Sequence, residues 1–227
     1  HVWGNLDLLK QPSIGFCGSR NVSEKGLSIT ADVVQQMVGL NRVIVSGHAS
    51  GVDIMAHRTA LECGGATIIV IAEGMANFRL HQEVKQLAKP DSVLIISGFE
   101  PDARWTVNQA MIRNNTIIGL SDAVVLIESR LEGGTFNAGE AALQLNVPIF
   151  VAEYETTTAN NKGNAYFIQH GAIALRKSAG TGRANIAPMK DLSSSNRNLN
   201  DRSSNDLKTA RSNRKKSSAD RKQSSMF

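Results

Sequence analysis

Six short runs of apolar, mostly β-branched residues recur along the chain, separated by stretches with helical or turn character. The runs are continuous rather than alternating, which is typical of parallel strands covered by helices on both faces. Because strand and helix alternate repeatedly, the sequence predicts an α/β fold with a doubly wound, mostly parallel, Rossmann-like sheet. The predicted strands are "SIGFCG" (13–18), "RVIVSG" (42–47), "ATIIVIAEG" (66–74), "SVLIISG" (92–98), "DAVVLIES" (122–129) and "VPIFVAE" (147–153).

Two intervening helices have recognisable ends. The stretch 22–40 begins with a candidate N-cap, Ser23, and repeats apolar residues along one face. The stretch 52–65 follows the second predicted strand and ends at paired glycines, which suit a helix C-terminus. Both helices therefore fit the connections of a parallel sheet.

The composition changes after about Leu175. Residues 1–176 carry 13 Lys and Arg against 16 Asp and Glu, a net charge of −3, whereas residues 177–227 carry 12 against 4, a net charge of +8. The second part is rich in Ser, Asn, Lys and Arg, and it has few apolar residues to offset the entropy lost on ordering. We therefore expect a single domain over residues 1–176 and a disordered basic tail over 177–227, within which the pattern allows a short helix around 205–216.

The basic tail has alternative interpretations. A Lys- and Arg-rich disordered segment can hold nucleic acid through counterion release without reading its sequence. It can equally be a solubilising end or a segment that recruits a partner. Aromatic residues make up 5% of the chain, and the tail has none before Phe227. Base stacking by the tail is therefore not expected, and DNA binding through it should depend strongly on salt.

The cysteine content and the hydropathy indicate a compartment. Cys17 and Cys63 have neither the spacing of zinc ligands nor the density of a disulfide scaffold, which favours a reducing interior. No apolar stretch is long enough to cross a bilayer, and no secretory signal opens the sequence. We expect a cytoplasmic protein with no membrane partner. The first residue is His1 rather than Met, which leaves open whether the N-terminus is native.

Small and hydroxyl-bearing residues gather directly after several predicted strands. In open parallel sheets, ligands bind beyond the carboxyl ends of the strands, where helix N-termini offer N–H groups to anions. Glycines let these amides approach an oxyanion closely, although tight βα turns also need glycine for their own geometry. The pattern favours a phosphate-bearing ligand. The loops are Gly18-Ser19-Arg20, Ser46-Gly47-His48-Ala49-Ser50-Gly51 and Glu132-Gly133-Gly134-Thr135.

The same loops exclude several common sites. Their glycine spacing fits neither a dinucleotide fingerprint nor a Walker loop, so a conventional NAD or ATP site is not expected. His48, His81 and His170 lack ligand spacing to one another, and no Ser-His-Asp arrangement is evident. We therefore expect no cofactor and no metal.

Six segments occur in the order and spacing of one family. "SGHASGVDIMAH" (46–57) aligns without a gap with the pattern Ser-Gly-x-Ala-Arg-Gly-Ile-Asp-x-x-Ala-His. Over nearly all of its first 175 residues, the chain resembles the DNA-processing protein A family, also called DprA or Smf. The resemblance implies a Rossmann-type domain that binds single-stranded DNA, forms a homodimer and loads a RecA-type recombinase during transformation. The segments are "VWGNLDLL" (2–9), "PSIGFCGSRNVSEKGL" (12–27), "VSGHASGVDIMAHRTAL" (45–61), "RNNTIIGLSDAVVLIE" (113–128), "GGTFNAGEA" (133–141) and "GNAYFIQHGA" (163–172).

The strand-end loops and the resemblance together give a set of candidate residues. Arg20 could instead form a salt bridge to a neighbouring loop, and Arg113 lies off the centre of its helix's apolar face, where a solvated side chain is equally consistent. Asp53 and His57 are four residues apart on one helix, and we expect a bond between them that fixes the loop rather than transfers a proton. The candidate DNA- or phosphate-binding residues are Gly18, Ser19, Arg20, Ser46, Gly47, Ser50, Gly51, Arg113, Asn114, Gly133, Gly134, Thr135 and Lys162.

Departures from the family pattern keep a second hypothesis open. Ser50 and Asn115 stand where the family has arginines, and residues 1–176 have a net negative charge, so we expect weaker DNA binding than is usual for the family. The alternative is a nucleotide sensor or a nucleoside-monophosphate phosphoribohydrolase similar to the LOG enzymes, with Glu140 as a weak catalytic candidate. Glu140 follows Thr135 by five residues where that family's loop has three. The favoured hypothesis is a non-enzymatic DNA-binding protein.

Overall fold

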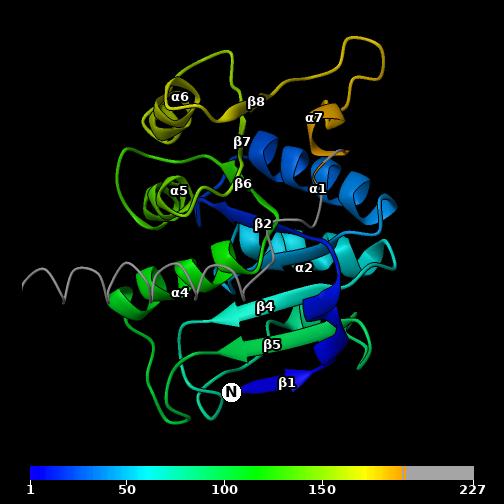
Figure 1. Cartoon of the computed structure of the whole chain (residues 1–227), viewed down its shortest axis with the longest axis vertical. Coiled ribbons are helices and arrows are strands. Elements are labelled where there is room, and N and C mark those ends of the chain that lie inside the picture. The colour runs from blue at the N-terminus through cyan, green and yellow to red at the C-terminus, as the bar shows by residue number, and fades with distance from the viewer. Residues whose placement is uncertain (191, 193–227) are drawn as a thin grey trace, which may run out of the picture. The chain divides into compact units, whose positions relative to one another are not determined.

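The computed structural model describes residues 1–190 and residue 192, and these form one eight-stranded sheet in the order β1-β5-β4-β3-β2-β6-β7-β8 (Figure 1). All neighbouring strands pair in parallel except β1, which is antiparallel to β5. The prediction of a doubly wound, mostly parallel α/β sheet is confirmed.

Each of the six predicted strands is present and lies within its predicted range, as β2 to β7. The edge strands β1 and β8 were not predicted, because three residues are too few to show a pattern. The strands are β1 (Val2–Gly4), β2 (Ser13–Gly18), β3 (Val43–Ser46), β4 (Thr67–Ile71), β5 (Val93–Ser97), β6 (Ala123–Ile127), β7 (Ile149–Ala152) and β8 (Ile173–Leu175). The helices are the 3-10 helix η1 (Leu6–Lys10), α1 (Glu24–Gly39), α2 (Val52–Glu62), α3 (Gln82–Lys85), α4 (Val107–Gly119), α5 (Gly134–Gln144), α6 (Lys162–Gln169) and α7 (Ala187–Lys190).

Helices cover both faces of the sheet, α1 and α2 on one side and α4, α5 and α6 on the other (Figure 1). Strand β6 illustrates why the predicted strands are continuous apolar runs, since its side chains alternate between the two cores. Val125 and Ile127 pack into the core beneath α1 and α2, whereas Val124 and Leu126 pack beneath α4 and α5. Because both faces are buried, all five residues of β6 are apolar.

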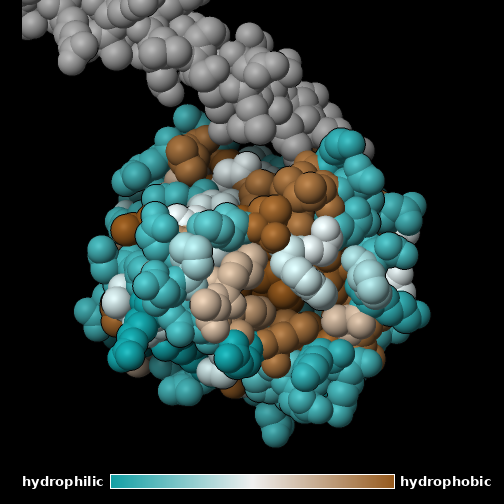
Figure 2. All heavy atoms as spheres, turned by 90° about the horizontal axis from the view of Figure 1, so that it is seen from below, coloured by the Kyte–Doolittle hydropathy of each residue, from teal (hydrophilic) through white to brown (hydrophobic). Residues whose placement is uncertain are grey.

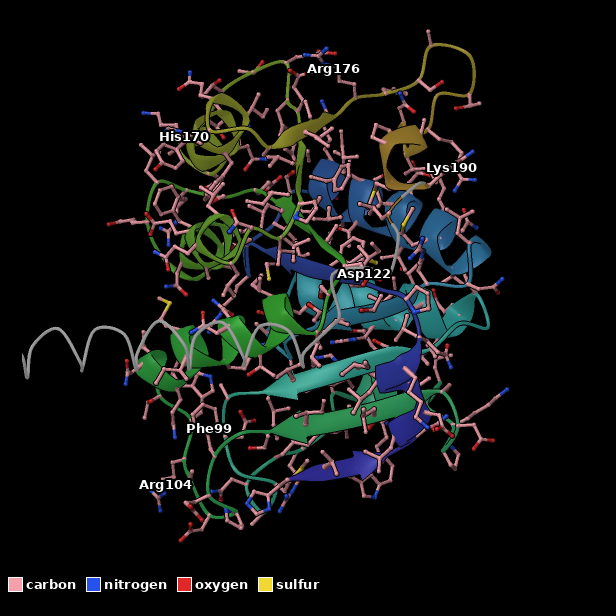
Figure 3. The ribbon with its side chains drawn as sticks, in the orientation of Figure 1. Phe99, Arg104, Asp122, His170, Arg176 and Lys190 are labelled. Carbon is pink, nitrogen blue, oxygen red and sulfur yellow. The ribbon has the colours of Figure 1, made fainter. Side chains whose placement is uncertain are left out.

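The order of the strands reverses beside β2. From β2 the chain proceeds through β3 and β4 to β5 on one side, and α4 then returns it to β6, which pairs with β2 on the other side. Such a reversal opens a crevice between the carboxyl ends of the two central strands, where ligands of doubly wound folds bind. In Figure 3, Phe99 and Arg104, on the connection that follows β5, mark this edge of the sheet.

Described secondary structure continues beyond Arg176, where the sequence predicted the domain to end. Lys177 and Ala184 form an antiparallel bridge, and α7 follows. Ile186 (6% exposed) and Met189 (0% exposed) enter the core beside α1, where Arg183 also forms an ion pair of 2.5 Å with Asp32. Two isolated apolar side chains in a polar sequence supply this packing, which explains why composition alone did not reveal it. The predicted helix at 205–216 lies outside the described residues.

We expect Met189→Ala to lower the free energy of unfolding by about 3 kcal/mol, because truncating a fully buried methionine leaves a cavity. Urea denaturation of the full chain measures the change. Lys190→Ala is the matched control, since Lys190 lies on the same short helix and is exposed. A Met189 variant as stable as the Lys190 variant would contradict the packing of this segment.

The end of the sheet that carries β1 shows a hydrophobic area bordered by hydrophilic residues (Figure 2). Val2 and Trp3 of β1 and Leu6 of η1 are each more than half exposed. Only three residue pairs join β1 to β5, so the exposed edge is too short to offer a long template for pairing with another chain. Among the described residues, no helix has the length and apolarity that a membrane span needs.

Candidate functional site

A hollow of about 410 Å³ opens at the carboxyl ends of β2 and β6, where the strand order reverses. We call it the switch-point pocket. The loops after β2 and β6 and the N-terminal half of α4 form its walls. The predicted site residues that line it are Gly18, Ser19, Arg20, Arg113, Asn114, Gly133, Gly134 and Thr135.

A second hollow of about 260 Å³, which we call the side hollow, shares Arg20, Trp105 and Arg113 with the switch-point pocket. The loop after β3 and the two residues that follow β4, Ala72 and Glu73, complete its lining. Ser50 is the predicted residue that it adds. The two hollows therefore form one continuous site with a common wall.

Four predicted residues, Ser46, Gly47, Gly51 and Lys162, line neither hollow. Ser46 is fully buried, and its hydroxyl donates to the Phe16 carbonyl at 2.7 Å, so it is not available to a phosphate. Gly47 is also buried, and Lys162 is exposed at the start of α6. The serine and the glycines of the β3–α2 loop shape the site instead of facing it.

Arg113 is buried, with 8% of its surface exposed. Its position on the helix was also consistent with a solvated side chain, which the structure does not show. Its Nη1 donates to the Val70 carbonyl at 2.9 Å and lies 4.0 Å from Asp53 Oδ2. The guanidinium passes directly over Gly47, where an added Cβ would lie 1.5 Å from Nη1. Close approach of an arginine, rather than of a phosphate, therefore requires glycine at this position.

Asp53 and His57 hold the β3–α2 loop through separate partners, in place of the expected bond between them. Asp53 Oδ2 accepts from the Ala49 amide at 3.2 Å. His57 is fully buried, with Nε2 2.5 Å from the Gly47 carbonyl and Nδ1 2.6 Å from Thr67 Oγ1. Burial lowers the pKa of His57 to about 3, so the ring is neutral at physiological pH. Because the His57 ring is neutral and both of its nitrogens lie within hydrogen-bond distance of a partner, His57 stabilises the fold of this loop.

The loop after β6 presents a helix N-terminus to the pocket. Gly133 caps α5 with a φ of 92°, a left-handed conformation that favours glycine, and offers no capping side chain. Asn114 steadies this turn by donating to the Gly134 carbonyl at 3.0 Å. A Cβ added to Gly134 would meet no atom within 4 Å, so the turn faces open space. Its first N–H groups lack partners within the helix, and they favour an anion there.

Three arginines and three carboxylates line the switch-point pocket, but they are not equivalent. Asp53 faces buried Arg113, whereas Arg20 and Arg130 are exposed at the mouth. Glu132, on the same loop as Arg130, is also exposed. The exposed basic side chains are thus the ones that an incoming ligand meets first.

Glu128, the third carboxylate, joins the two sides of the crevice. It is 5% exposed, accepts from the Ser23 amide at 2.9 Å, and also bonds the Ser23 hydroxyl. Ser23 Oγ in turn accepts from the Gly26 amide at 3.1 Å and caps α1, as the sequence predicted. Glu128 has a φ of 52°, which costs a non-glycine residue on the order of 1–3 kcal/mol. This contact between the β2 and β6 sides offsets that cost.

Sequence reasoning missed Trp105 and Arg130. Arg130 directly follows the predicted strand 122–129, and Trp105 lies on the connection after the predicted strand 92–98. Neither residue is small or belongs to a family motif, so the signals at the strand ends do not single it out. The guanidinium of Arg20 lies 5.3 Å from the centroid of the Trp105 ring, which places a cation and an aromatic ring together at the junction of the two hollows.

Glu140, the weak catalytic candidate, is exposed on α5 and lines neither hollow. It is therefore not placed to act on a ligand held in the switch-point pocket.

Comparison with known proteins identifies relatives in several bacteria. DNA processing protein DprA of Streptococcus pneumoniae is 32% identical over 171 residues, which are 74% of this chain and 60% of that protein. The corresponding protein of Bacillus subtilis is 28% identical over 176 residues, 76% of this chain and 59% of that protein. The chain thus spans about 60% of the length of these curated relatives.

Two solved structures share the fold. The X-ray structure of the S. pneumoniae protein gives a TM-score of 0.70 at 31% identity and covers 77% of this chain and 62% of that chain. DNA processing protein A from Helicobacter pylori, in a structure described in terms of its single-stranded DNA binding mode, gives a TM-score of 0.67 at 25% identity and covers 76% of this chain and 80% of that chain.

A family-level match agrees with these similarities. Residues 1–181 match the family described as DNA recombination-mediator protein A. That description is of a mediator and not of an enzyme, in agreement with the sequence-based expectation, and the match confirms the resemblance found in the motifs. The chain therefore belongs to the DNA recombination-mediator protein A family.

Proposed function

We propose that the protein binds single-stranded DNA through its phosphates at the switch-point pocket. The observation that carries the proposal is the open first turn of α5 at Gly133 and Gly134, with Arg20 and Arg130 exposed at the mouth of the same pocket. The relative from H. pylori, whose structure is described with single-stranded DNA, supports the choice of ligand.

Backbone amides and arginines recognise phosphates without reading bases, so this site suits single strands of any sequence. The net charge of +8 over residues 177–227 adds a second, salt-sensitive attraction. We extend the proposal to a cytoplasmic homodimer that acts in DNA uptake during transformation and in recombination, where it loads a RecA-type recombinase.

We expect Arg20→Ala and Arg130→Ala each to weaken binding of a fluorescent oligo-dT by about tenfold and to lower the slope of log affinity against log salt by about one, because each removes a phosphate contact. Titrations of the full chain at low and moderate salt measure both. Arg113 is unsuitable for this test, since its buried contacts also hold the fold.

Lys10→Ala is the matched control, because it removes one exposed positive charge from the helix that precedes β2, at the opposite edge of the sheet. If the Lys10 variant lost as much affinity as the two pocket variants, net charge rather than the pocket would account for binding.

A second candidate ligand is a free nucleotide. The volume of about 410 Å³ lies within the usual range of small-molecule sites, and Glu128 and Glu132 make the walls less basic than a DNA groove usually is. Competition decides between the two ligands. A nucleoside monophosphate that displaces oligo-dT at micromolar concentration favours the nucleotide, whereas displacement only by oligonucleotides favours DNA.

A further inference from the structure

Large apolar side chains gather at the mouth of the switch-point pocket. Of the ten large hydrophobic residues that are exposed in the described part of the chain, four belong to two short segments that line this pocket. Trp105, Val107 and Ile112 lie on α4 or directly before it. Leu131 lies on the loop after β6, which forms another wall. Exposed apolar side chains that gather in one place commonly mark a protein interaction surface.

Single-stranded DNA does not account for the aliphatic part of this cluster. A strand offers phosphates, which need cations, and bases, which stack on aromatic rings. Val107 and Leu131 are both more than half exposed, and neither side chain has a π-face or a polar atom to offer to a strand. Leaving aliphatic side chains in water has a cost in free energy, which a partner with apolar side chains of its own removes.

The charged side chains at the same mouth select the sign of such a partner. Arg20, Arg104 and Arg130 are exposed at or beside the lining. Of the three carboxylates in the lining, only Glu132 is exposed, whereas the other two are buried and have hydrogen-bond partners of their own. The mouth therefore has an excess of accessible positive charge, and guanidinium groups bind carboxylates as well as phosphates.

The loop that carries Trp105 and the arginine before it is held firmly in place. The Gly74 amide donates to the Ala103 carbonyl at 2.8 Å, and Asn77 Nδ2 donates to the Asp102 carbonyl at 2.7 Å. These bonds tie the connection after β5 to the connection after β4. A preorganised surface loses little conformational entropy when a partner binds to it, and tryptophan and arginine are common among the residues that dominate protein binding.

We propose that the mouth of the switch-point pocket docks an acidic segment of a partner protein. Apolar side chains of the segment pack on Trp105, Val107 and Leu131, and its carboxylates pair with Arg20 and Arg130. The inference rests on the proposed function, in which the same arginines hold DNA phosphates, so the segment and the strand exclude each other. A partner of this chemistry therefore releases DNA from the pocket. Residues 177–227 have a net charge of +8 and do not match the segment that this mouth selects.

The test uses the full chain and two fluorescent peptides of equal length, one of Asp-Asp-Leu repeats and one of Asp-Asp-Ser repeats. The two carry the same charge, so their attraction to the basic tail is the same. We expect the wild-type chain to bind the leucine peptide about tenfold more tightly than the serine peptide. Val107→Ser and Leu131→Ser should each weaken binding of the leucine peptide by about 3- to 10-fold, and binding of oligo-dT by less than about twofold.

Ile173→Ser is the matched control, because Ile173 is an exposed aliphatic residue at the start of β8, at the opposite edge of the sheet from the pocket. This variant should bind the leucine peptide as the wild-type chain does. Arg130→Ala should weaken binding of the leucine peptide and of oligo-dT by about tenfold each, since carboxylates and phosphates share this side chain.

Competition tests the shared site directly. The leucine peptide should displace oligo-dT from the wild-type chain at a several-fold lower concentration than the serine peptide. Equal binding of the two peptides, or displacement that Val107→Ser and Leu131→Ser leave unchanged, would overturn the docking site. A chain that bound oligo-dT but did not bind the leucine peptide would keep the proposed function and lose the docking site. A chain that bound the leucine peptide but not oligo-dT would lose the proposed function and keep the docking site.

Discussion

Replacing Gly47 with alanine is expected to lower the free energy of unfolding by about 3 kcal/mol and to reduce oligonucleotide binding severely. The new Cβ would lie 1.5 Å from Arg113 Nη1 and 2.5 Å from Asp53 Oδ2, so the guanidinium must leave its place. Its departure breaks the bond to the Val70 carbonyl and leaves Asp53 buried without its countercharge. Breaking one side of a buried ion pair usually costs about 3–5 kcal/mol.

Urea denaturation and oligo-dT titration of the full chain measure the two effects. Gly119→Ala is the matched control, because Gly119 ends α4 and an added Cβ there would meet no atom within 4 Å. The control should be as stable as the wild-type chain or slightly more so. A Gly47 variant with wild-type stability would show that Arg113 can relocate without loss, against the tight fit described above.

Acidification from pH 7 to pH 5 is expected to remove about 2 kcal/mol of stability through His57 alone. The folded state holds the pKa of His57 at about 3, whereas the unfolded chain has the ordinary value of 6.5. Between these values the unfolded state binds the proton and the folded state does not, so stability falls as the pH falls below 6.5. His48 acts in the same direction down to about pH 4. Asp53, whose pKa burial raises, acts in the opposite direction at lower pH.

Denaturant unfolding at pH 7, 6 and 5 tests this expectation. His57→Gln should be less stable at pH 7 but should show a much shallower dependence on pH. His170→Gln should keep the full dependence, because His170 is exposed at the end of α6. The same steep pH dependence in the His57 variant would assign the acid sensitivity to other groups.

The sequence was informative wherever local pattern and burial coincide. The apolar runs predicted β2 to β7 because both faces of each strand are covered, and Ser23 marked the start of α1. Ligands of parallel sheets bind beyond the carboxyl ends of the strands, and most of the site residues predicted on that basis lie around one pocket. Strands of three residues, such as β1 and β8, carry too little pattern and depend on the neighbour that each one pairs with.

The remaining features depend on contacts between distant segments. Helical periodicity placed Arg113 off the apolar face of α4. Its side chain is nevertheless buried, because Gly47 leaves room for the guanidinium and Asp53 supplies the opposite charge. The four-residue spacing of Asp53 and His57 allowed a bond, but the Gly47 carbonyl and Thr67 offer His57 better-placed partners. The spacing of residues along a helix does not show which of several possible hydrogen-bond partners a side chain will take.

The bonds from Glu128 to Ser23 have a kinetic consequence. They link the loop after β6 to the start of α1 across the crevice, so the floor of the pocket keeps its width before any ligand arrives. A pocket that needs no opening step leaves association limited by encounter and orientation, which commonly gives protein association rates of about 10⁵–10⁷ M⁻¹s⁻¹. Differences in residence time, set by how firmly the ligand is held, then determine which ligands the protein retains.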